Sequence, residues 1–217
     1  MYSLGVMSAY NYVRKALDEL DTAEEVGMLT QMDNLDLYNL VQGSIVEAAV
    51  MIQAAAPAYL IEGRKGVLDE DYSIEMIEPD VPEIRMLQPT LRVVSLKASD
   101  SRVIVTGFLP EDSAEARKQL DPYVRGTHDD PKAVTVKMWE EDLHPVIRYY
   151  SYSPDRQKKT IEVEYIPYPQ IVEQMVDIAA RMEYPVLNMI VSLVLESLSQ
   201  FDAAALYRKK ATEYFQR

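Results

Sequence analysis

The sequence predicts an α+β protein in which the N- and C-terminal segments form a helical bundle that carries an inserted antiparallel β-rich subdomain. Apolar residues recur at helical spacing near both ends of the 217-residue chain. Ten of the twelve prolines fall between Pro79 and Pro169, where alternating and β-branched residues replace the helical pattern. These observations place the bundle at 1–62 and 168–217 and the β-rich insertion at 63–167.

Two helices are predicted in the N-terminal segment. The first covers Ser8–Leu20, where apolar side chains are three or four residues apart. The second begins at Asn34 or Asp36, either of which can cap it, and ends at Ala56 before Pro57. Its apolar stripe has a period near 3.6 and consists of Leu37, Val41, Ile45, Ala48, Ile52 and Ala56.

Six strands are predicted in the middle of the chain from alternation and β-branched residues. They are Tyr72–Ile77, Leu91–Leu96, Arg102–Thr106, Ala133–Trp139, Val146–Tyr152 and Thr160–Ile166. The polar run Ser153–Lys159 predicts a hairpin between the last two strands. A short helix, Ser113–Leu120, interrupts the series.

Three helices are predicted after Tyr168. The first carries a stripe made of Ile171, Met175, Ile178, Ala179 and Met182. The second, Val186–Leu198, is apolar on most faces and therefore needs several packing partners. The third begins near Asp202 and runs to Phe215. The simplest arrangement packs these helices against those of the N-terminal segment.

The composition disfavours most enzyme classes. The chain has no Cys and only two His, which leaves no disulfide, no thiolate ligand and few imidazoles for zinc. Its 22 basic and 35 acidic residues give a net charge of −13, which opposes binding nucleic acid through phosphate neutralisation. From this composition we expect no catalytic residues and no cofactor. No signal peptide or spanning helix is predicted, so we expect a soluble protein from a reducing compartment.

The acidic clusters and the histidines are the remaining candidates for chemistry. The clusters Asp69–Asp71, Asp129–Asp130 and Glu140–Asp142 offer oxygen ligands for Mg²⁺ or Ca²⁺, as in a carboxylate-dependent hydrolase or nuclease. None fits the calcium-loop pattern, and adjacent acids on a strand point to opposite faces. His128 lies in a loop rich in Gly, Asp and Pro, and no nucleophile motif accompanies it. We therefore predict no metal site.

Partner binding is a better-supported expectation. Tyrosine is over-represented, with 15 Tyr against three Phe and one Trp, and tyrosine is enriched at interfaces. The last helix is amphipathic and basic, so its residues are the candidate partner-binding set: Tyr207, Arg208, Lys209, Lys210, Tyr214, Phe215 and Arg217. Two interpretations stay open, a helix that docks into a partner's groove and a bundle helix that packs within its own chain.

Several segments, in this order and spacing, carry a resemblance to a known family. They are Val13–Glu19, Ile45–Leu60, Leu91–Ser101, Tyr123–Val134, Val163–Pro169 and Ser192–Tyr207. The pattern resembles the head-to-tail connector, or ring adaptor, proteins of tailed bacteriophages, especially those of crAss-like phages of Bacteroidales. The resemblance spans most of the chain and supplies no catalytic residues.

The resemblance implies a structural virion protein, made in the bacterial host cytoplasm and placed at the portal–tail junction. Such adaptors form a homo-oligomeric ring, commonly of twelve copies, between the portal and neighbouring tail or ring proteins, with no membrane contact. Twelve copies at −13 each would carry about −156, which would let DNA pass without specific binding. The candidate channel-lining residues are Asp129, Asp130, Glu140, Glu141 and Asp142. The alternatives are the metal-dependent hydrolase or nuclease and a non-viral interaction module.

Overall fold

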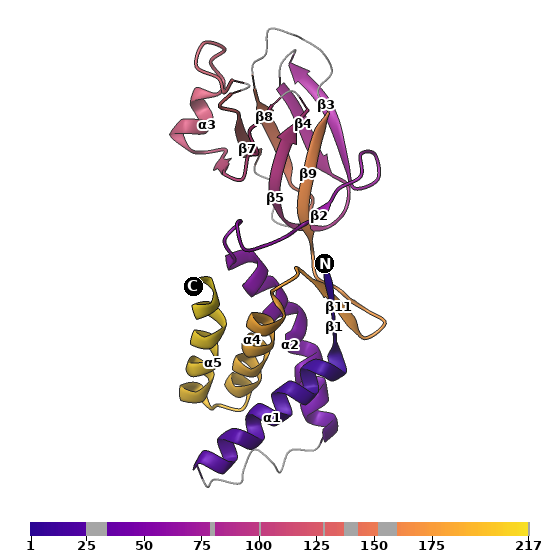
Figure 1. Ribbon diagram of the computed structural model, residues 1–217, viewed down its shortest axis with the longest axis vertical. Helices are drawn as coiled ribbons and strands as arrows, with labels where there is room; N and C mark the ends of the chain where they lie inside the picture. Colours follow the sequence, from indigo (N-terminus) through magenta and orange to yellow (C-terminus); the bar gives the residue numbers. More distant parts are fainter. Residues whose placement is uncertain are drawn as a thin grey trace. The chain divides into compact units, whose positions relative to one another are not determined.

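The chain folds into two compact units (Figure 1). The computed structural model describes residues 1–24, 34–78, 81–99, 101–127, 129–136, 143–151 and 160–216. The helical unit consists of Met1–Glu62 and Pro169–Arg217, and the sheet unit consists of Gly63–Tyr168. Each unit has its own buried apolar residues.

Helix α4 is the centre of the helical unit. It runs from Glu183 to Ser197 and packs against α1 (Val6–Glu24), α2 (Asn34–Ala55) and α5 (Phe201–Glu213), which ends in a 3₁₀ turn at Tyr214–Gln216. Most of its residues are buried, so its apolar surface on most faces is covered by these three neighbours. The predicted helices of this unit are therefore present, except for the one placed directly after Tyr168.

That exception is a β-hairpin. Strands β10 (Ile171–Val172) and β11 (Met175–Ile178) form a three-stranded antiparallel sheet with β1 (Tyr2–Gly5), in the order β1-β11-β10. Along β11, Val176 and Ile178 are buried and Met175 and Asp177 are exposed, which is the two-residue period of a strand. The predicted helical stripe from Ile171 to Met182 is wrong because the same residues also fit a strand period interrupted by a turn.

Among the described residues, helix α2 has the length and composition nearest to those of a membrane-spanning helix. It has 22 residues and a mean hydropathy of 1.2 over its most apolar window. One face is covered inside the unit, with Val41, Ile45 and Ala48 fully buried. A core helix of a soluble protein can have the same length and composition, so these two properties are weak support for a membrane contact.

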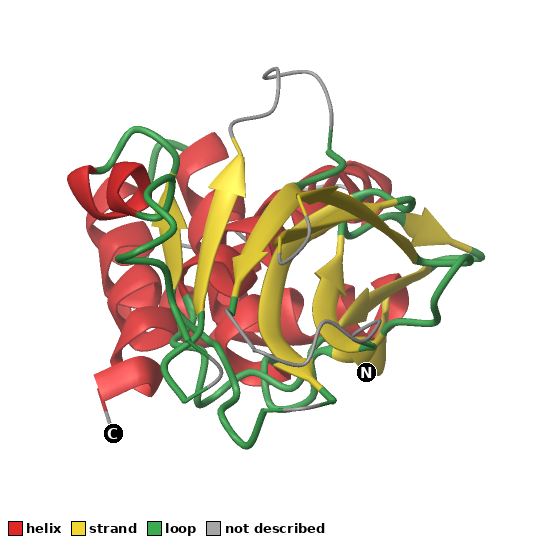
Figure 2. Ribbon diagram, turned by 90° about the horizontal axis from the view of Figure 1, so that it is seen from above, coloured by secondary structure: helices red, strands yellow, loops and turns green. Residues whose placement is uncertain are grey.

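The sheet unit contains two sheets whose strands curve strongly (Figure 2). One has the order β2-β9-β5 and comprises β2 (Arg64–Lys65), β9 (Ile161–Pro167) and β5 (Thr90–Ala98). The other has the order β3-β4-β8-β7-β6 and comprises β3 (Tyr72–Glu78), β4 (Val81–Met86), β8 (Val146–Tyr150), β7 (Lys132–Val136) and β6 (Phe108–Pro110). Both sheets contribute to one core, which includes Ile84, Leu96, Ile147, Tyr149, Ile161 and Tyr165.

Several strand predictions need correction. The predicted strand Arg102–Thr106 is reduced to a single bridge between Val105 and Leu96. The predicted hairpin between β8 and β9 does not form, because β8 pairs with β4 and β7 while β9 pairs with β5 and β2. Strand β6 pairs in parallel with β7, so this sheet is not purely antiparallel. The end of the predicted strand Ala133–Trp139 lies outside the described residues.

The predicted fold class, a helical bundle with an inserted antiparallel β subdomain, is wrong. Within the described residues, five helices and three sheets share the chain, and one of these sheets lies in the helical unit itself. The short helix α3 (Ala114–Lys118) belongs to the sheet unit, where the Ser113 side chain caps it by accepting a hydrogen bond from the Ala116 amide. The hairpin after Tyr168 is the physical reason that the bundle assignment fails.

Candidate functional site

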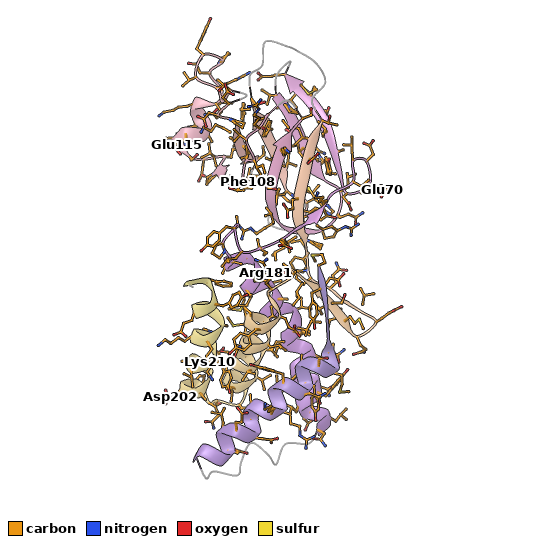
Figure 3. The ribbon with its side chains drawn as sticks, in the orientation of Figure 1. Glu70, Phe108, Glu115, Arg181, Asp202 and Lys210 are labelled. Atoms are coloured by element: carbon orange, nitrogen blue, oxygen red, sulfur yellow. The ribbon has the colours of Figure 1, made fainter. Side chains whose placement is uncertain are left out.

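A groove lined by tyrosines lies among α1, α4 and α5 of the helical unit. It consists of two adjoining hollows of about 310 Å³ and 210 Å³ that share Tyr184 and Lys210. We call this feature the tyrosine groove; its lining is Tyr12, Lys15, Ala16, Glu19, Tyr184, Asn188, Tyr207, Lys210, Glu213 and Tyr214. Lys210, on α5, is labelled in Figure 3.

The groove exists because α5 lies close to α4. Ala204 and Ala211 are buried, and their small side chains let the two helices approach. The Ser192 hydroxyl on α4 donates a hydrogen bond of 2.9 Å to the Ala204 carbonyl, which fixes this approach. Tyr207, which is also largely buried, then lies at the floor of the groove, while Tyr184 at the start of α4 is half exposed.

Polar groups of the groove join α1 to α4 through hydrogen bonds. The Tyr12 hydroxyl donates to Asn188 Oδ1 at 3.4 Å, and Asn188 Nδ2 donates to the Tyr184 carbonyl at 2.8 Å. Burial raises the pKa of Tyr12 and of Tyr207, and Glu19 acts in the same direction on both phenols. Both phenols are therefore neutral at physiological pH and can donate and accept hydrogen bonds.

Charges of both signs border the groove. The Lys210 ammonium lies 4.1 Å from the centroid of the Tyr207 ring, a cation–π contact. Lys15 and Glu19, one helical turn apart on α1, form an exposed ion pair of 3.9 Å. An aromatic floor with a mixed polar rim suits a protein segment as its ligand.

The structure gathers only part of the predicted partner-binding set in this groove. Tyr207, Lys210 and Tyr214 line it. Arg208 instead forms a 2.6 Å ion pair with Glu196 on α4, and Lys209 pairs with Glu213 at 3.6 Å.

The remaining members of the set do not line the groove. The Phe215 ring packs edge-on against Tyr214 with 6.3 Å between centroids. Arg217 lies outside the described residues. Of the two interpretations of the last helix, packing within its own chain is the one seen here, because α5 rests on α4.

The predicted channel-lining residues are described only in part. Asp129 and Asp130 are exposed, and Asp130 forms a 2.6 Å ion pair with Lys132. Glu140, Glu141 and Asp142 lie outside the described residues, as does His128. Of the five predicted lining residues, the described part of the chain therefore includes only the neighbouring pair Asp129 and Asp130.

Asp71, in the first acidic cluster, has hydrogen-bond partners within the sheet unit. Its carboxylate is largely buried and accepts hydrogen bonds from the Tyr165 hydroxyl at 2.9 Å and from the Val67 amide at 2.9 Å. Arg64 lies 3.6 Å from the same carboxylate. Across the described part of the chain, no group of three or more acidic or histidine side chains is placed to hold a metal ion.

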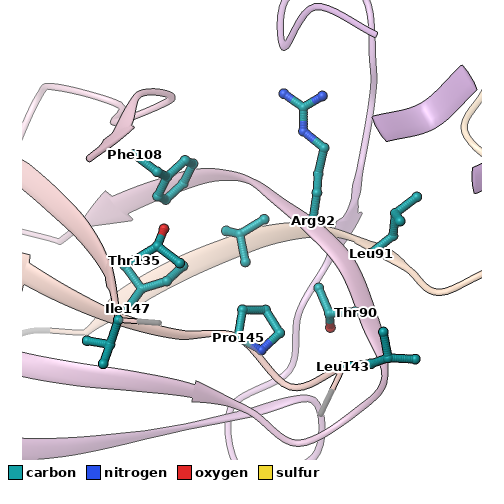
Figure 4. Close-up of a pocket in the computed structure, with 10 residues that line it drawn as sticks. Thr90, Leu91, Arg92, Phe108, Thr135, Leu143, Pro145 and Ile147 are labelled. Atoms are coloured by element: carbon teal, nitrogen blue, oxygen red, sulfur yellow. The ribbon is translucent and has the colours of Figure 1, made fainter. Parts of the chain in front are cut away.

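A further hollow lies in the sheet unit (Figure 4). It has a volume of about 510 Å³ and mostly apolar walls, formed by Val93, Phe108, Val136, Leu143, Pro145 and Ile147 among others. Arg92 is the charged member of the described lining, and burial lowers the pKa of its guanidinium. We call this hollow the β7–β8 pocket.

Sequence reasoning found one wall of the tyrosine groove and missed the other. Tyr12 and Tyr184 were not singled out because α1 and α4 are far apart in the chain and no motif joins them. The tyrosine excess was the available signal, but a residue count does not show which tyrosines lie together. Tyr149, Tyr150 and Tyr165, for example, are buried core residues of the sheet unit. No protein-family model and no curated protein sequence matches this chain.

Proposed function

We propose that this chain is a structural virion protein, a ring-forming adaptor that connects a bacteriophage portal to the tail. The observation that carries the proposal is the tyrosine groove, because it brings Tyr207, Lys210 and Tyr214 of the C-terminal helix together with Tyr12 and Tyr184. The resemblance to phage connectors assigns docking on the portal or on the next ring to that helix. Aromatic side chains with a wet polar end are typical of such protein interfaces.

In this proposal the helix does not leave its own unit to dock. Its buried side, with Ala204 and Ala211, stays on α4, and its tyrosines form a receptor surface for a segment of the portal or of a neighbouring ring protein. The energetic reason is that detaching α5 would expose its packed apolar side chains and break the hydrogen bond from Ser192 to Ala204.

The net charge supports the second part of the proposal. Each copy carries −13, and a ring of such copies would repel DNA phosphates from its passage. Asp129, Asp130, Glu140, Glu141 and Asp142 remain the proposed lining. Replacing all five with their amides would leave ring size unchanged and raise the affinity of the assembled ring for duplex DNA.

Two adjacent lysines provide a matched test of the docking surface. Lys210 lines the tyrosine groove, whereas Lys209, one residue earlier, lies outside its lining and is highly exposed. The variants Lys210→Glu and Lys209→Glu make the same charge change on neighbouring positions of α5. Each would be co-expressed with the portal protein of a crAss-like phage, and the amount that copurifies with the portal would be measured.

We expect Lys210→Glu and Tyr184→Ala to reduce copurification by about tenfold or more, as for residues at the centre of an interface. Lys209→Glu should copurify like the unmodified chain. Equal losses for both lysine variants would place the docking surface elsewhere. Failure of the unmodified chain to bind any portal or ring protein would contradict the proposed function itself.

A further inference from the structure

A rigid apolar knob projects from the sheet unit directly after α3. In residues 120–124, Leu120, Tyr123 and Val124 are 61%, 96% and 56% exposed. Three large apolar side chains within five residues are thus mostly open to solvent, and an exposed apolar group of this kind is a candidate interaction site. We call this feature the 120–124 knob.

The backbone of the knob is held firmly at its base. Arg125, whose side chain is only 10% exposed, donates from Nε to the Gln119 carbonyl at 2.9 Å and forms a 2.6 Å ion pair with Glu78 on β3. Its guanidinium also lies 5.8 Å from the centroid of the Tyr150 ring. Because these contacts order the base of the segment in the free chain, its backbone loses little conformational entropy on binding.

The Gly126 amide completes the base of the knob. It donates a hydrogen bond of 2.9 Å to the side-chain oxygen of the buried Gln119. A Cβ atom at Gly126 would come within 2.6 Å of the Tyr150 carbonyl oxygen and 2.8 Å of the Lys132 amide nitrogen. The base of the knob therefore lies against the end of the β7–β8 ladder where Lys132 pairs with Tyr150.

The β7–β8 pocket opens near the other end of the same ladder. There Val136 pairs with Val146, and the lining residues Leu143 and Pro145 lead into β8. The ladder has five residue pairs, and at about 3.4 Å per residue its ends are roughly 14 Å apart. One end of this ladder thus lies beside the apolar projection, and the other end lies beside most of the apolar hollow.

The volume of the pocket and the charges of the two surfaces also suit insertion of the knob. A volume of about 510 Å³ lies within the range of about 300–1,000 Å³ that accommodates bound groups in proteins, and it has room for an aromatic ring with its neighbours. The knob sequence Leu-Asp-Pro-Tyr-Val has one acidic side chain, Asp121, and no basic one. The charged member of the described pocket lining is the cation Arg92.

We propose that the 120–124 knob of one copy of this chain inserts into the β7–β8 pocket of the next copy. Such a contact joins two different surfaces, so repeated copies form a closed ring when the rotation closes. The proposal rests on the proposed function for ring closure, and it assigns the contact between subunits to the sheet unit. The tyrosine groove is then left for the portal or a neighbouring ring.

Photo-cross-linking from the knob tests this contact. The photoreactive amino acid p-benzoylphenylalanine would replace Tyr123 in the full chain. This variant would be mixed with an equal amount of isotope-labelled chain. The mixture would be irradiated without the portal, at up to about millimolar concentration, and also in the portal complex. Peptide mass spectrometry would then separate cross-links between copies from those within one chain. The same photoreactive residue at Tyr59, 78% exposed in the helical unit, is the matched control.

We expect cross-links between copies from position 123 to residues 90–93 or 143–147, and none to these residues from position 59. The pocket variant Leu143→Glu would place a negative charge opposite Asp121 of an inserted knob. This variant should therefore lower the yield of cross-links between copies about tenfold or more. The inference is overturned if cross-links form only within one chain, as they would if another segment of the same chain filled the pocket. It is also overturned if neither sample gives cross-links.

The same experiment separates this inference from the proposed function. A ring on the portal without cross-links to the pocket overturns the knob contact and leaves the adaptor function standing. Cross-links to the pocket between copies that assemble on no portal support the contact and contradict the adaptor function.

Discussion

The hydroxyl of Tyr38 on α2 donates a 2.6 Å hydrogen bond to Oε1 of Gln174, in the turn between β10 and β11. Glu173 and Gln174 form this turn with φ values of 49° and 64°, a conformation that non-glycine residues adopt at an energetic cost. The Gln174 carbonyl also accepts a hydrogen bond of 2.9 Å from the Val6 amide. A turn that its own residues disfavour is thus held by contacts from two helices.

Removing the Tyr38 hydroxyl is expected to destabilise the helical unit. The variant Tyr38→Phe loses one hydrogen bond at an exposed site, so the free energy of unfolding should fall by about 0.5–1 kcal/mol. Urea unfolding followed by circular dichroism measures the change. Tyr59→Phe, at an exposed tyrosine, is the control and should leave the midpoint unchanged. A Tyr38→Phe midpoint equal to that of the control would show that the contact does not support the turn.

The end of α4 offers a stabilising substitution. Ser199 has φ 62°, its amide donates to the Glu196 carbonyl, and the Gln200 amide donates to the Leu195 carbonyl. This pair of bonds defines a Schellman motif, in which the left-handed position favours glycine. Ser199→Gly should therefore raise the free energy of unfolding by about 0.5–1 kcal/mol. A lower melting temperature for this variant would contradict that account of the helix end.

Two glycines should respond to alanine in opposite directions. Gly126→Ala places a Cβ against the backbone of Lys132 and Tyr150, so a loss of about 1–3 kcal/mol in the free energy of unfolding is expected. Gly43 lies inside α2, where an added Cβ would meet nothing within 4 Å, so Gly43→Ala should gain about 0.5–1 kcal/mol. Chemical denaturation of both variants checks the pair, and a neutral Gly126→Ala would mean that the base of the knob can shift.

The sheet unit should lose stability at alkaline pH through Tyr165. Burial, together with the hydrogen bond to Asp71, raises the pKa of this phenol to about 12. In the unfolded chain the phenol titrates near pH 10, so the folded form retains a proton that the unfolded form releases. The stabilisation of the folded state by the protonated Tyr165 phenol is complete below pH 10 and is lost as the pH rises to about 12.

Comparison with Tyr165→Phe isolates this contribution, since phenylalanine cannot titrate. The difference in unfolding free energy between the two proteins should be constant from pH 7 to about 9 and should change in favour of the variant between pH 10 and 12. Urea titrations at a series of pH values measure it. Parallel curves across the whole range would rule out a perturbed phenol at this position.

The helices were largely predictable, and the reason is local. The stripe on α2 and the proline after it fix that helix without reference to the rest of the chain, and α4 is recognisable from its apolar faces. The hairpin after Tyr168 was not predictable because Ile171, Met175 and Ile178 fit both periods and its turn is Glu-Gln, with neither Gly nor Asn to signal it. Strand β4 was missed because Pro82 interrupts its pattern.

The pairing of strands was beyond local reasoning. Strands β8 and β9 follow each other in the chain, which favours a hairpin, yet each finds its partners among earlier strands. The tyrosine groove has the same character. Tyr207 and Lys210 were predicted from the amphipathic last helix, whereas Tyr12 joins them only because α1 and α5 both pack on α4.

The proposed adaptor function is tested most sharply by electron microscopy of this chain co-expressed with the portal of a crAss-like phage. We expect a ring of fixed copy number, twelve if the resemblance to phage adaptors holds, stacked on the tail-facing end of the portal, with a central passage left open. Portal particles without added ring density, recovered beside unassembled chain, would contradict it.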